Sequence, residues 1–497
     1  MKLCILDDAY DDSTSPMKEV DIPTDVERYF GHCEYEHHFL TKRTAVRQVT
    51  ELAARDFDVF VNLCDGAWDE DRPGIEVVQT LERLNVPFTG ADSKFYDPSR
   101  QTMKKVAHYY GIRTPAGVFA TTERDIEKAL DLLSFPLITK HPNSYSSIGM
   151  TRNSRVETAA DLRAEALRMI ASFGGVLIEE FIEGREFNVL VAENPDDPVN
   201  PITYEPVEFR FPVGETFKHF EMKWVLYGEM ASVSCEDPRF AEELKEISAC
   251  FFAGLKGTGY GRCDIRVDAD GCPYMLEINP NCGVFYPPHA EGSADLVLEL
   301  DPSGHRGFVE TILRAAYNRV RKPEKWTLEV DDGRGYGMYA REAYARGDLV
   351  YAYEEKPHVL VSRSVVESSW DELRRSWFSR FAYPITDEIY VMWSDDPDEW
   401  KPINHSCDPN TWLEGLNLVA RRPIAAGDEI TVDYATFCND IMEPFECSCG
   451  SANCRGIVRG TDYLEPFVDE YGDHVSDYVK SKRKTLAWEV QGNGRGD

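Results

Sequence analysis

The sequence predicts an α/β region over roughly the first two thirds of the chain, followed by a mostly β region. In the first ninety residues, short apolar runs of strand length alternate with a helix candidate, as in parallel α/β sheets. Longer amphipathic stretches continue to about residue 322. Beyond them the helical periodicity fades, and short strand-like pieces alternate with glycine and proline turns as far as Tyr434. A chain of 497 residues is also too long for one hydrophobic core.

The first elements are short. Lys2–Leu6 and Asp58–Leu63 are apolar runs of strand length. Gly74–Leu84 is a helix candidate that precedes a further strand candidate at Val86–Thr89. This alternation favours a parallel sheet at the N-terminus.

Two long helices and a hairpin are expected next. Apolar stripes predict the helices, and Asp264–Asp268 and Tyr274–Asn279 are predicted to be strands on either side of an Asp-Ala-Asp-Gly turn. The stripes are Leu162, Ala166, Met169, Ile170 and Phe173 in the first helix, and Phe240, Leu244, Ile247, Phe251 and Leu255 in the second.

Composition limits the partners. The hydrophobic share of 42% is ordinary for a globular protein, whereas the formal net charge is −33. Such an acidic surface repels nucleic acid and anionic membranes and attracts cations, so neither is expected as a partner. No apolar run is long enough for a signal peptide or a membrane span. Nine of the thirteen cysteines are scattered singly, which favours a reducing, cytoplasmic location.

Carboxylates near the predicted hairpin suggest a metal site. Glu277 and Asn279 lie on one strand face because strand side chains alternate, and Asp264 is on the neighbouring strand. Two carboxylates and an amide form a hard oxygen cage suited to Mg²⁺ carrying nucleotide phosphates. The alternative is that Asp264 and Glu277 simply face solvent.

Motif order strengthens the nucleotide interpretation. Lys140 follows an apolar strand and precedes a loop of small residues that could close over phosphates. Together with Ser99-Arg100…Lys104, Gly259…Asp264 and Leu276…Gly283, the order and spacing resemble the ATP-grasp fold, and in detail the D-alanine–D-alanine ligases, over residues 58–290.

The resemblance implies roles for individual residues. Lys104, Lys140 and Lys223 would contact ATP phosphates, Ser147 would cover them, Glu179, Glu180 and Ile182 would belong to the adenine hinge, and Glu186 would bind ribose. Asp264, Glu277 and Asn279 would hold Mg²⁺. A carboxylate would attack ATP to give an acyl phosphate, and an amine would then attack the acyl carbon. Arg262 and the backbone N–H of Gly283 would stabilise that transition state.

The amino-acid half departs from the family. Leu6-Asp7-Asp8-Ala9 replaces a glycine-rich stretch with a glutamate for the first substrate's ammonium, and Cys64-Asp65-Gly66 replaces a His-Gly motif. Phe285–His289 stands where the family has a serine for the acceptor carboxylate, and Arg100 replaces a lysine. D-alanine is therefore not expected as either substrate.

A second set of motifs follows in the last third. Gly335-Tyr336-Gly337 precedes Asn404-His405-Ser406-Cys407, then Asp433-Tyr434, and then Cys447-x-Cys449-x4-Cys454. This order resembles SET-domain methyltransferases with a post-SET tail, over residues 326–459.

By this resemblance, Gly335, Tyr336, Gly337, Asn404 and His405 hold S-adenosylmethionine, and Tyr434 is at the catalytic position. Cys447, Cys449 and Cys454 give three ligands where a closed zinc site needs four, and Cys407 is expected to be the fourth. The alternative is unliganded thiols. The aromatics that would form either a substrate channel or ordinary core are Tyr390, Trp393, Trp400 and Phe437.

Five parts are expected in order: 1–95, a pre-ATP-grasp α/β domain; 96–322, the ATP-grasp domain; 323–445, the SET domain; 446–462, the post-SET zinc motif; and 463–497, an appendage. The expected protein is a bifunctional ligase and N-methyltransferase that uses ATP, Mg²⁺, S-adenosylmethionine and Zn²⁺. Its substrates are expected to be small molecules or peptides with carboxylate and amine groups, including a lysine-like methyl acceptor. The alternative is a protein lysine methyltransferase, histone-directed and nuclear, with a nucleotide-binding module. The sequence makes no prediction of oligomeric state.

Overall fold

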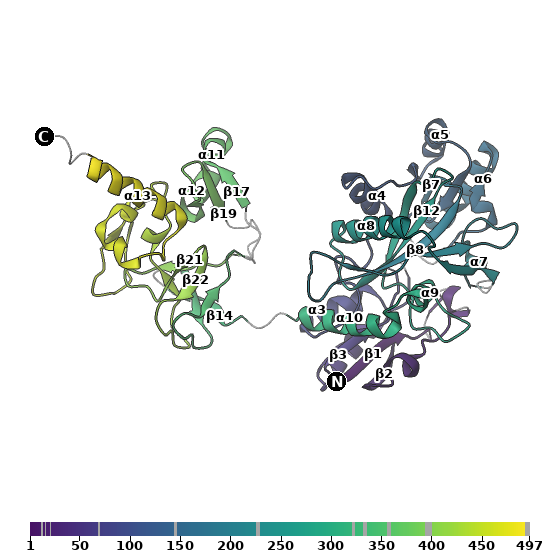
Figure 1. The fold of residues 1–497 in the computed structure, drawn as a ribbon, viewed down its shortest axis with the longest axis horizontal. Coiled ribbons are helices and arrows are strands. Elements are labelled where there is room, and N and C mark those ends of the chain that lie inside the picture. The colour runs from purple at the N-terminus through teal and green to yellow at the C-terminus, as the bar shows by residue number, and fades with distance from the viewer. Residues whose placement is uncertain are drawn as a thin grey trace. The chain divides into compact units, whose positions relative to one another are not determined.

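The computed structural model has two compact units, Met1–Arg321 and Lys322–Asp497, which we describe separately (Figure 1). In the part of the chain that the structure describes, no helix is long and apolar enough to cross a membrane. The described residues are 1–10, 13–14, 16–19, 21–67, 70–143, 147–224, 229–320, 324–331, 335–354, 359–392 and 400–492.

A parallel three-stranded sheet opens the first unit. Strand β1 (Lys2–Asp8) lies between β2 (Glu34–Leu40) and β3 (Val59–Asn62), so the predicted parallel sheet is confirmed. The sequence pattern missed β2, because its partly exposed side chains are mostly polar or charged. The expected strand at Val86–Thr89 is wrong: it contributes a single bridge between Phe60 and Phe88.

The second sheet is antiparallel, in the order β4-β7-β5-β6. Ile138 of β5 faces Glu179 of β7, and Lys140 lies two residues further on, so Lys140 and Glu179 share a sheet face. The strands are β4 (Gly117–Ala120), β5 (Leu137–Lys140), β6 (Arg155–Val156) and β7 (Val176–Glu180), and the helices packed on them are α5 (Glu123–Leu132) and α6 (Ala159–Phe173).

The third sheet has the order β11-β10-β8-β12-β13, with β9 paired to β8. The predicted hairpin is present as the antiparallel pair β12 and β13; β12 begins four residues before the predicted strand, and β13 extends the predicted strand by one residue at each end. The strands are β8 (Arg185–Ala192), β9 (Ile202–Thr203), β10 (Val207–Arg210), β11 (Ala231–Ser234), β12 (Tyr260–Val267) and β13 (Pro273–Pro280).

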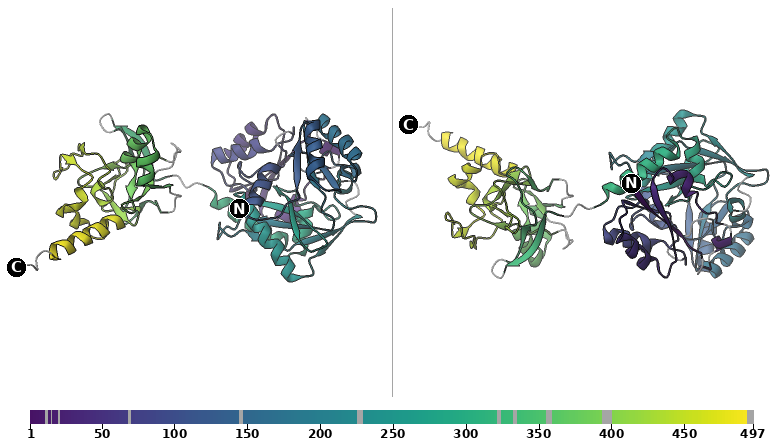
Figure 2. Two further views of the ribbon diagram at one scale, coloured as in Figure 1. Left: turned by 90° about the horizontal axis from the view of Figure 1, so that it is seen from above. Right: turned by 90° about the horizontal axis from the view of Figure 1, so that it is seen from below.

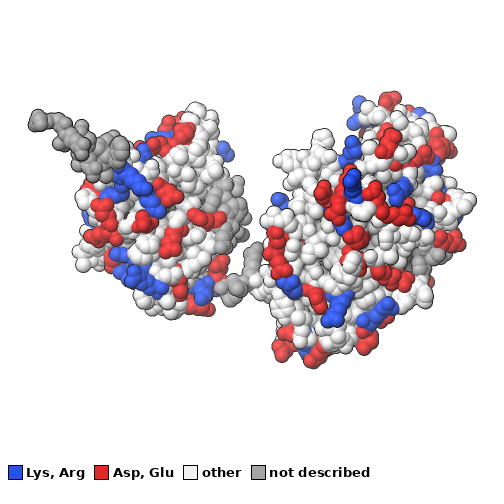
Figure 3. All heavy atoms as spheres, in the orientation of Figure 1, with Lys and Arg blue, Asp and Glu red and all other residues white. Residues whose placement is uncertain are grey.

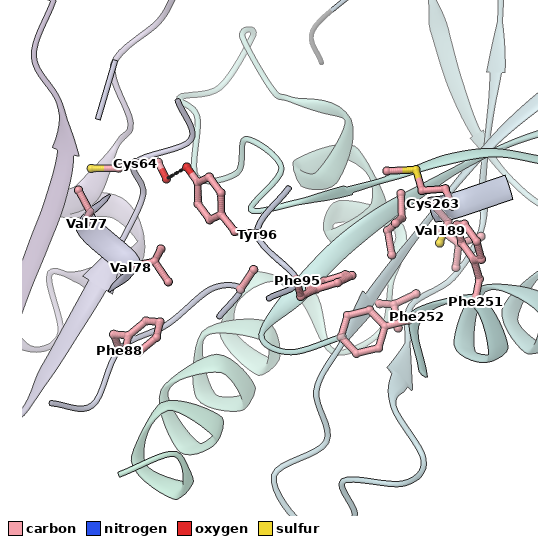
Figure 4. Close-up of a cluster of buried hydrophobic side chains, with 14 of the residues drawn as sticks. Cys64, Val77, Val78, Phe88, Phe95, Tyr96, Val189, Phe251, Phe252 and Cys263 are labelled. Carbon is pink, nitrogen blue, oxygen red and sulfur yellow. Dashed lines mark hydrogen bonds between the residues drawn. The ribbon is translucent and has the colours of Figure 1, made fainter. Parts of the chain in front are cut away.

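One buried cluster joins the first and third sheets. Figure 4 shows Val77 and Val78 of helix α3 (Ile75–Leu84), which follows β3, in the same cluster as Val189 of β8 and Phe251 of helix α8 (Pro238–Gly254). Burial of this much apolar surface fixes the two sheets relative to each other. The helices of the unit are α1 (Val26–Phe30), α2 (Ala45–Ala53), α3 (Ile75–Leu84), α4 (Arg100–Tyr109), α7 (Phe220–Trp224), α8 (Pro238–Gly254), α9 (Ser293–Leu300) and α10 (Gly304–Asn318), with 3-10 turns η1 (Pro16–Glu19) and η2 (Arg152–Ser154).

The second unit is built from small sheets, as predicted, but it also contains helices that the sequence pattern did not indicate (Figure 2). The helices are α11 (Arg363–Ser369), α12 (Glu372–Phe381) and α13 (Asp477–Gly492), with 3-10 turns η5 (Tyr434–Thr436), η6 (Asp462–Leu464) and η7 (Pro466–Tyr471). The paired strands are β14 (Trp326–Asp331) with β15 (Gly335–Ala340); β16 (Leu349–Tyr351) with β22 (Asn417–Ala420) and β21 (Thr411–Glu414); β17 (Val359–Ser362) with β19 (Ile389–Met392) and β18 (Tyr383–Pro384); β20 (Asn404–His405) with β23 (Thr431–Val432); and β24 (Phe445–Glu446) with β25 (Ile457–Val458).

Candidate active sites in the two units

Strands β12 and β13 bring the three expected Mg²⁺ ligands together. Asp264 lies directly opposite Glu277, so both side chains are on one face, and Asn279 shares that face two residues on. The Nδ2 of Asn279 donates to Asp264 Oδ2 at 3.2 Å. Carboxylate and amide oxygens are the donors that Mg²⁺ prefers, so these residues fit the ion.

Two arginines contact the same carboxylates. Arg262 donates to Asp264 from Nε at 2.7 Å and from Nη2 at 3.1 Å, and Arg100 forms an ion pair with Glu277. Burial alone would raise the pKa of Asp264, but the adjacent Arg262 outweighs it and lowers that pKa. The Asp264 carboxylate is therefore held in its charged, metal-binding form.

Two of the predicted ATP lysines share a buried carboxylate. Glu179 is ion-paired with Lys104 at 2.5 Å and with Lys140 at 2.8 Å. Burial would raise the pKa of Glu179, but Lys140 and Lys104 outweigh it and bring that pKa to about 2. Glu179 thus fixes the two lysines beside a cleft that the motifs predict to bind nucleotide, which we call the nucleotide cleft, and the Glu179 side chain is not in its lining.

The nucleotide cleft itself is a hollow of about 80 Å³ between the second and third sheets. Ser147 lies on its rim with φ of 58°, and its Oγ donates to the backbone carbonyl of Lys218 at 2.9 Å. Lys104, Glu179 and Asn279 are absent from the described lining, although Asn279 lines the neighbouring cavity. The predicted residues that line the cleft are Lys140, Ser147, Glu180, Ile182, Glu186, Lys223, Arg262, Asp264 and Glu277.

Lys218 is a cleft residue that sequence reasoning missed. Its Nζ donates to Asn188 Oδ1 at 3.1 Å and lies 3.3 Å from Glu186 Oε1. Burial and the nearby Arg262 lower the pKa of Lys218, and burial with Arg262 and Lys218 lowers that of Lys223 to about 8. The sequence carried no signal for Lys218 beyond its position five residues before Lys223.

A second cavity, of about 380 Å³, adjoins the nucleotide cleft. Lys218, Lys223 and Arg262 line both, so cationic side chains form the border between them. The predicted oxyanion donor Gly283 lines the second cavity together with Arg262. A Cβ at residue 283 would lie 2.7 Å from the hydroxyl of Tyr286, so the Tyr286 side chain would have to shift to admit one.

The second unit has its own cleft, of about 410 Å³. Of the residues predicted to hold S-adenosylmethionine, Gly335, Tyr336 and Asn404 line it, as does Tyr434. Asn404 Nδ2 donates to the carbonyl of Tyr336 at 3.2 Å, which links the two motifs. Gly337 lies beside them, since a Cβ there would be 2.8 Å from Asn404 Nδ2.

The imidazole of His405 is not in the cleft lining. Its Nδ1 accepts the backbone N–H of Tyr434 at 3.2 Å, and its Nε2 lies 3.3 Å from Cys407 Sγ. The side chain of His405 therefore positions the Tyr434 backbone, which leaves only its main chain for cofactor contacts. Tyr434 donates its hydroxyl to the carbonyl of Ile403 at 2.9 Å, and burial raises its pKa.

Aromatic side chains surround Tyr434. Of the predicted channel walls, Trp400 and Phe437 line the cleft. Tyr390 is instead fully buried in a separate core cluster, where its hydroxyl accepts from Asn439 at 2.9 Å. Trp393 lies outside the described residues. The cleft aromatics that the sequence did not single out are Tyr353, Phe381 and Tyr383.

The four expected zinc ligands converge. The sulfurs of Cys407, Cys447, Cys449 and Cys454 all lie within 4.8 Å of one another, and Cys407 and Cys447 are 3.9 Å apart. Four thiolates about 2.3 Å from one zinc would be about 3.8 Å apart, so the cluster fits that ion.

Arg455 links the cysteine cluster to the catalytic motif. It follows Cys454 and donates two hydrogen bonds of 2.7 Å to Asp433, the fully buried residue before Tyr434. Tyr471 donates to the same carboxylate at 2.9 Å. The tail is therefore tied to the residue next to the catalytic position.

Both units match known protein families. Residues 105–286 match the family model described as "D-ala D-ala ligase C-terminus", and residues 335–435 match "SET domain". A D-alanine–D-alanine ligase of Cupriavidus necator is 28% identical over 291 residues, which cover 57% of this chain and 83% of that protein. One from Pseudomonas fluorescens is 31% identical over 210 residues, covering 41% and 60%.

Solved structures also align with part of this chain. The D-alanine–D-alanine ligase of Bacillus anthracis complexed with ATP aligns with 64% of this chain and 97% of its own, at 19% identity and a TM-score of 0.49.

The sequence matches define the class of protein: an enzyme with an ATP-grasp region of the D-alanine–D-alanine ligase type, joined to a SET domain. The chain therefore joins a region similar to D-alanine–D-alanine ligases to a SET domain, and the resemblance noted in its motifs is confirmed.

Proposed function

We propose that the first unit is a carboxylate–amine ligase that works through an acyl phosphate, and that the second unit methylates a lysine-like amine. The observation that carries the ligase proposal is one cleft lined by Lys140, Lys223, Arg262, Asp264 and Glu277. Three cations line both this cleft and the adjoining cavity, which supports phosphate chemistry in the cleft beside a substrate in that cavity.

In the first step, the carboxylate of one substrate attacks the γ-phosphate of ATP, and ADP leaves. The ammonium groups of Lys140 and Lys223 neutralise charge that spreads over the phosphate oxygens. With a pKa of about 8, Lys223 is mostly protonated at pH 7 and so carries the charge this role requires. Asp264, Glu277 and Asn279 would hold Mg²⁺, which supplies further neutralisation of phosphate charge when bound.

In the second step, an amine attacks the acyl carbon and phosphate leaves. Arg262 and Gly283 line one cavity, and we propose that the Arg262 side chain and the Gly283 backbone N–H stabilise the oxygen that becomes negative. The relatives are named for D-alanine, but Asp7-Asp8, Asp65 and Phe285–His289 replace the family's amino-acid contacts. We therefore propose other small carboxylates and amines as substrates.

For the methyl transfer, we propose that Tyr434 orients the acceptor amine within an aromatic channel. The nitrogen lone pair attacks the methyl carbon, the sulfonium sulfur leaves, and a proton passes from nitrogen to solvent. Tyr383 and Phe437, whose rings are 5.9 Å apart, line the cleft with Tyr434. Such an apolar channel favours the neutral, nucleophilic amine over its charged form.

The tail is proposed to hold one zinc ion through its four cysteines. Because Arg455 joins the tail to Asp433, bound zinc would order the channel next to Tyr434. None of the thirteen cysteines is in a disulfide, which supports a reducing compartment, and we propose the cytoplasm.

The test uses the full chain with ATP, Mg²⁺, S-adenosylmethionine and a pool of amino acids and lysine-containing dipeptides. ADP release and product masses are measured for the wild type, Glu277→Gln and Tyr434→Phe. We expect Glu277→Gln to abolish ADP release only and Tyr434→Phe to slow methylation only, by about a hundredfold. Glu246→Gln, at an exposed helix position, is the matched control and should change neither.

Two outcomes would oppose the proposal. Absence of ADP release with every carboxylate and amine would refute the ligase. Robust methylation of histones, with none of free lysine, dipeptides or ligase product, would favour a protein lysine methyltransferase with a nucleotide-binding module.

A further inference from the structure

A third cavity, of about 430 Å³, lies at the carboxyl end of β1. Among its described lining residues are four carboxylates and no lysine or arginine. Asp7 and Asp8 are the last residues of β1, whereas Asp21 and Asp65 come from later segments of the chain. The acids therefore meet because of the fold and not because of one acidic run.

One carboxylate oxygen of Asp8 is a buried hydrogen-bond acceptor that no strong hydrogen-bond donor contacts. The residue is 8% exposed, and its Oδ2 accepts from Arg72 at 3.1 Å. Its Oδ1 is buried and has no hydrogen-bond partner among the described residues beyond the nearby thiol of Cys64, a weak donor. A buried carboxylate oxygen left in this state is costly unless a ligand supplies the donor.

Arg72 cannot neutralise the group alone. Its guanidinium contacts Asp8, Asp65 and Glu70, the last at 2.6 Å, so one positive charge serves three carboxylates. Burial, together with the Asp65 charge, raises the pKa of Asp8. Burial likewise raises the pKa of Asp21 to about 6, although the Tyr10 hydroxyl donates to it.

The negative charge of Asp7, the remaining acid, is partly compensated by its neighbours. Asp7 accepts from the Thr24 hydroxyl at 2.7 Å and lies 3.2 Å from the imidazole of His37. The cavity as a whole is therefore negative beyond what the neighbouring Arg72 balances, and an entering cation would relieve that charge.

The third cavity adjoins the second cavity, in which we propose that acyl transfer takes place. Asp65, Cys282, Gly283 and Tyr286 line it and also the second cavity, where Gly283 and Arg262 are placed for acyl transfer. The aromatic side chains of Tyr10 and Tyr286 also line it, and ring faces attract cations.

We propose that this cavity binds the cationic side chain of the carboxylate substrate, so that the ligase activates a basic amino acid such as lysine, ornithine or arginine. This rests on the proposed ligase function, with the substrate carboxylate at Gly283 and Arg262. The α-ammonium group of a neutral amino acid would need about one carboxylate, whereas four carboxylates line this cavity. A basic substrate is also the kind of amine that the methyltransferase unit is proposed to accept.

The experiment compares cationic compounds with neutral counterparts of similar size. Binding of the D- and L-forms of lysine, ornithine and arginine to the full chain is measured by titration calorimetry, with a non-hydrolysable ATP analogue and Mg²⁺ present. Norleucine and citrulline are the neutral counterparts. ADP release with each compound is measured in parallel, with ATP and an amine pool.

We expect at least one cationic compound to bind and turn over at least about tenfold better than its neutral counterpart. Asp8→Asn and Asp21→Asn should each reduce that preference, whereas Asp131→Asn, an exposed control, should not. The comparison in the wild-type protein does not depend on whether either variant folds.

The two hypotheses fail separately. ADP release with neutral amino acids that matches or exceeds that with cationic ones would overturn the basic-substrate proposal and leave the ligase intact. Failure of every cationic compound to bind would also overturn it. Selective binding of a cation without any ADP release would support the cavity assignment and refute the ligase function.

Discussion

The Glu179→Gln substitution removes the carboxylate that Lys104 and Lys140 share. Glu179 is 1% exposed, and the two ammonium groups outweigh its burial to bring its pKa from 4.5 to about 2. That fall corresponds to about 3 kcal/mol of unfolding free energy. Breaking a buried ion pair by removing one partner costs about 3–5 kcal/mol in general. We therefore expect the free energy of unfolding of the first unit to fall by about 3 kcal/mol at pH 7.

The pH dependence has a defined sign. A carboxylate whose pKa is lowered by folding stabilises the protein above its unfolded pKa and loses that effect as the pH falls. The difference between wild type and Glu179→Gln should be complete at pH 7 and should shrink as the pH falls from about 4.5 towards 2.

Urea unfolding of the full chain measures the difference in unfolding free energy between wild type and Glu179→Gln. The transition that ATP with Mg²⁺ shifts to higher urea concentration is assigned to the first unit. A triple variant, Lys104→Met with Lys140→Met and Glu179→Gln, is the matched control. Replacing all three charges leaves no unpaired buried ion, so it should recover much of the lost stability while abolishing ATP turnover. Equal unfolding midpoints for wild type and Glu179→Gln at pH 7 would refute the reasoning.

Four further predictions concern the two sites. Lys140→Ala should abolish ADP release and leave S-adenosylmethionine binding unchanged in calorimetry; normal ADP release would remove Lys140 from the phosphate site. Elemental analysis should find about one zinc per chain, and a chelator should reduce methylation before ADP release; metal-replete protein without zinc would contradict the four-cysteine site. Tyr434→Phe should slow methylation by about a hundredfold with ATP turnover unchanged, as radiolabelled methyl transfer would report. Val432 lies buried in the cleft and lacks the bulk of a tyrosine, so we expect mass spectrometry to detect di- or trimethylated product and Val432→Tyr to shift it towards monomethylated product.

The charged residues also show which properties of the protein can be predicted from composition alone. The acidic total of −33 follows from the sequence, and acids and bases are interspersed on the face drawn in Figure 3. Net charge predicts attraction of cations in general. It does not predict that Asp7, Asp8, Asp21 and Asp65 line one cavity, because that requires the contacts between β1 and later segments.

The sequence by itself determined those features in which chemistry depends on local spacing. Alternation along a strand put Glu277 and Asn279 on one face, and the intervening turn residues brought Asp264 opposite them. The cysteine spacing of the tail indicated a metal site in the same way, and the four sulfurs do converge. Local apolar patterns failed where strands are short or polar, as at β2, and where helices α11 and α12 lie among small sheets.

Tertiary structure alone decided which charges meet. Glu179 reaches Lys104 and Lys140 across two elements, Lys218 reaches Glu186 from a loop, and none of these distances follows from sequence separation. It also turned the His405 side chain away from the cleft and towards the Tyr434 backbone. The physical reason is that a side chain's charge, burial and pKa depend on every segment packed around it, and most of those segments are distant in the chain.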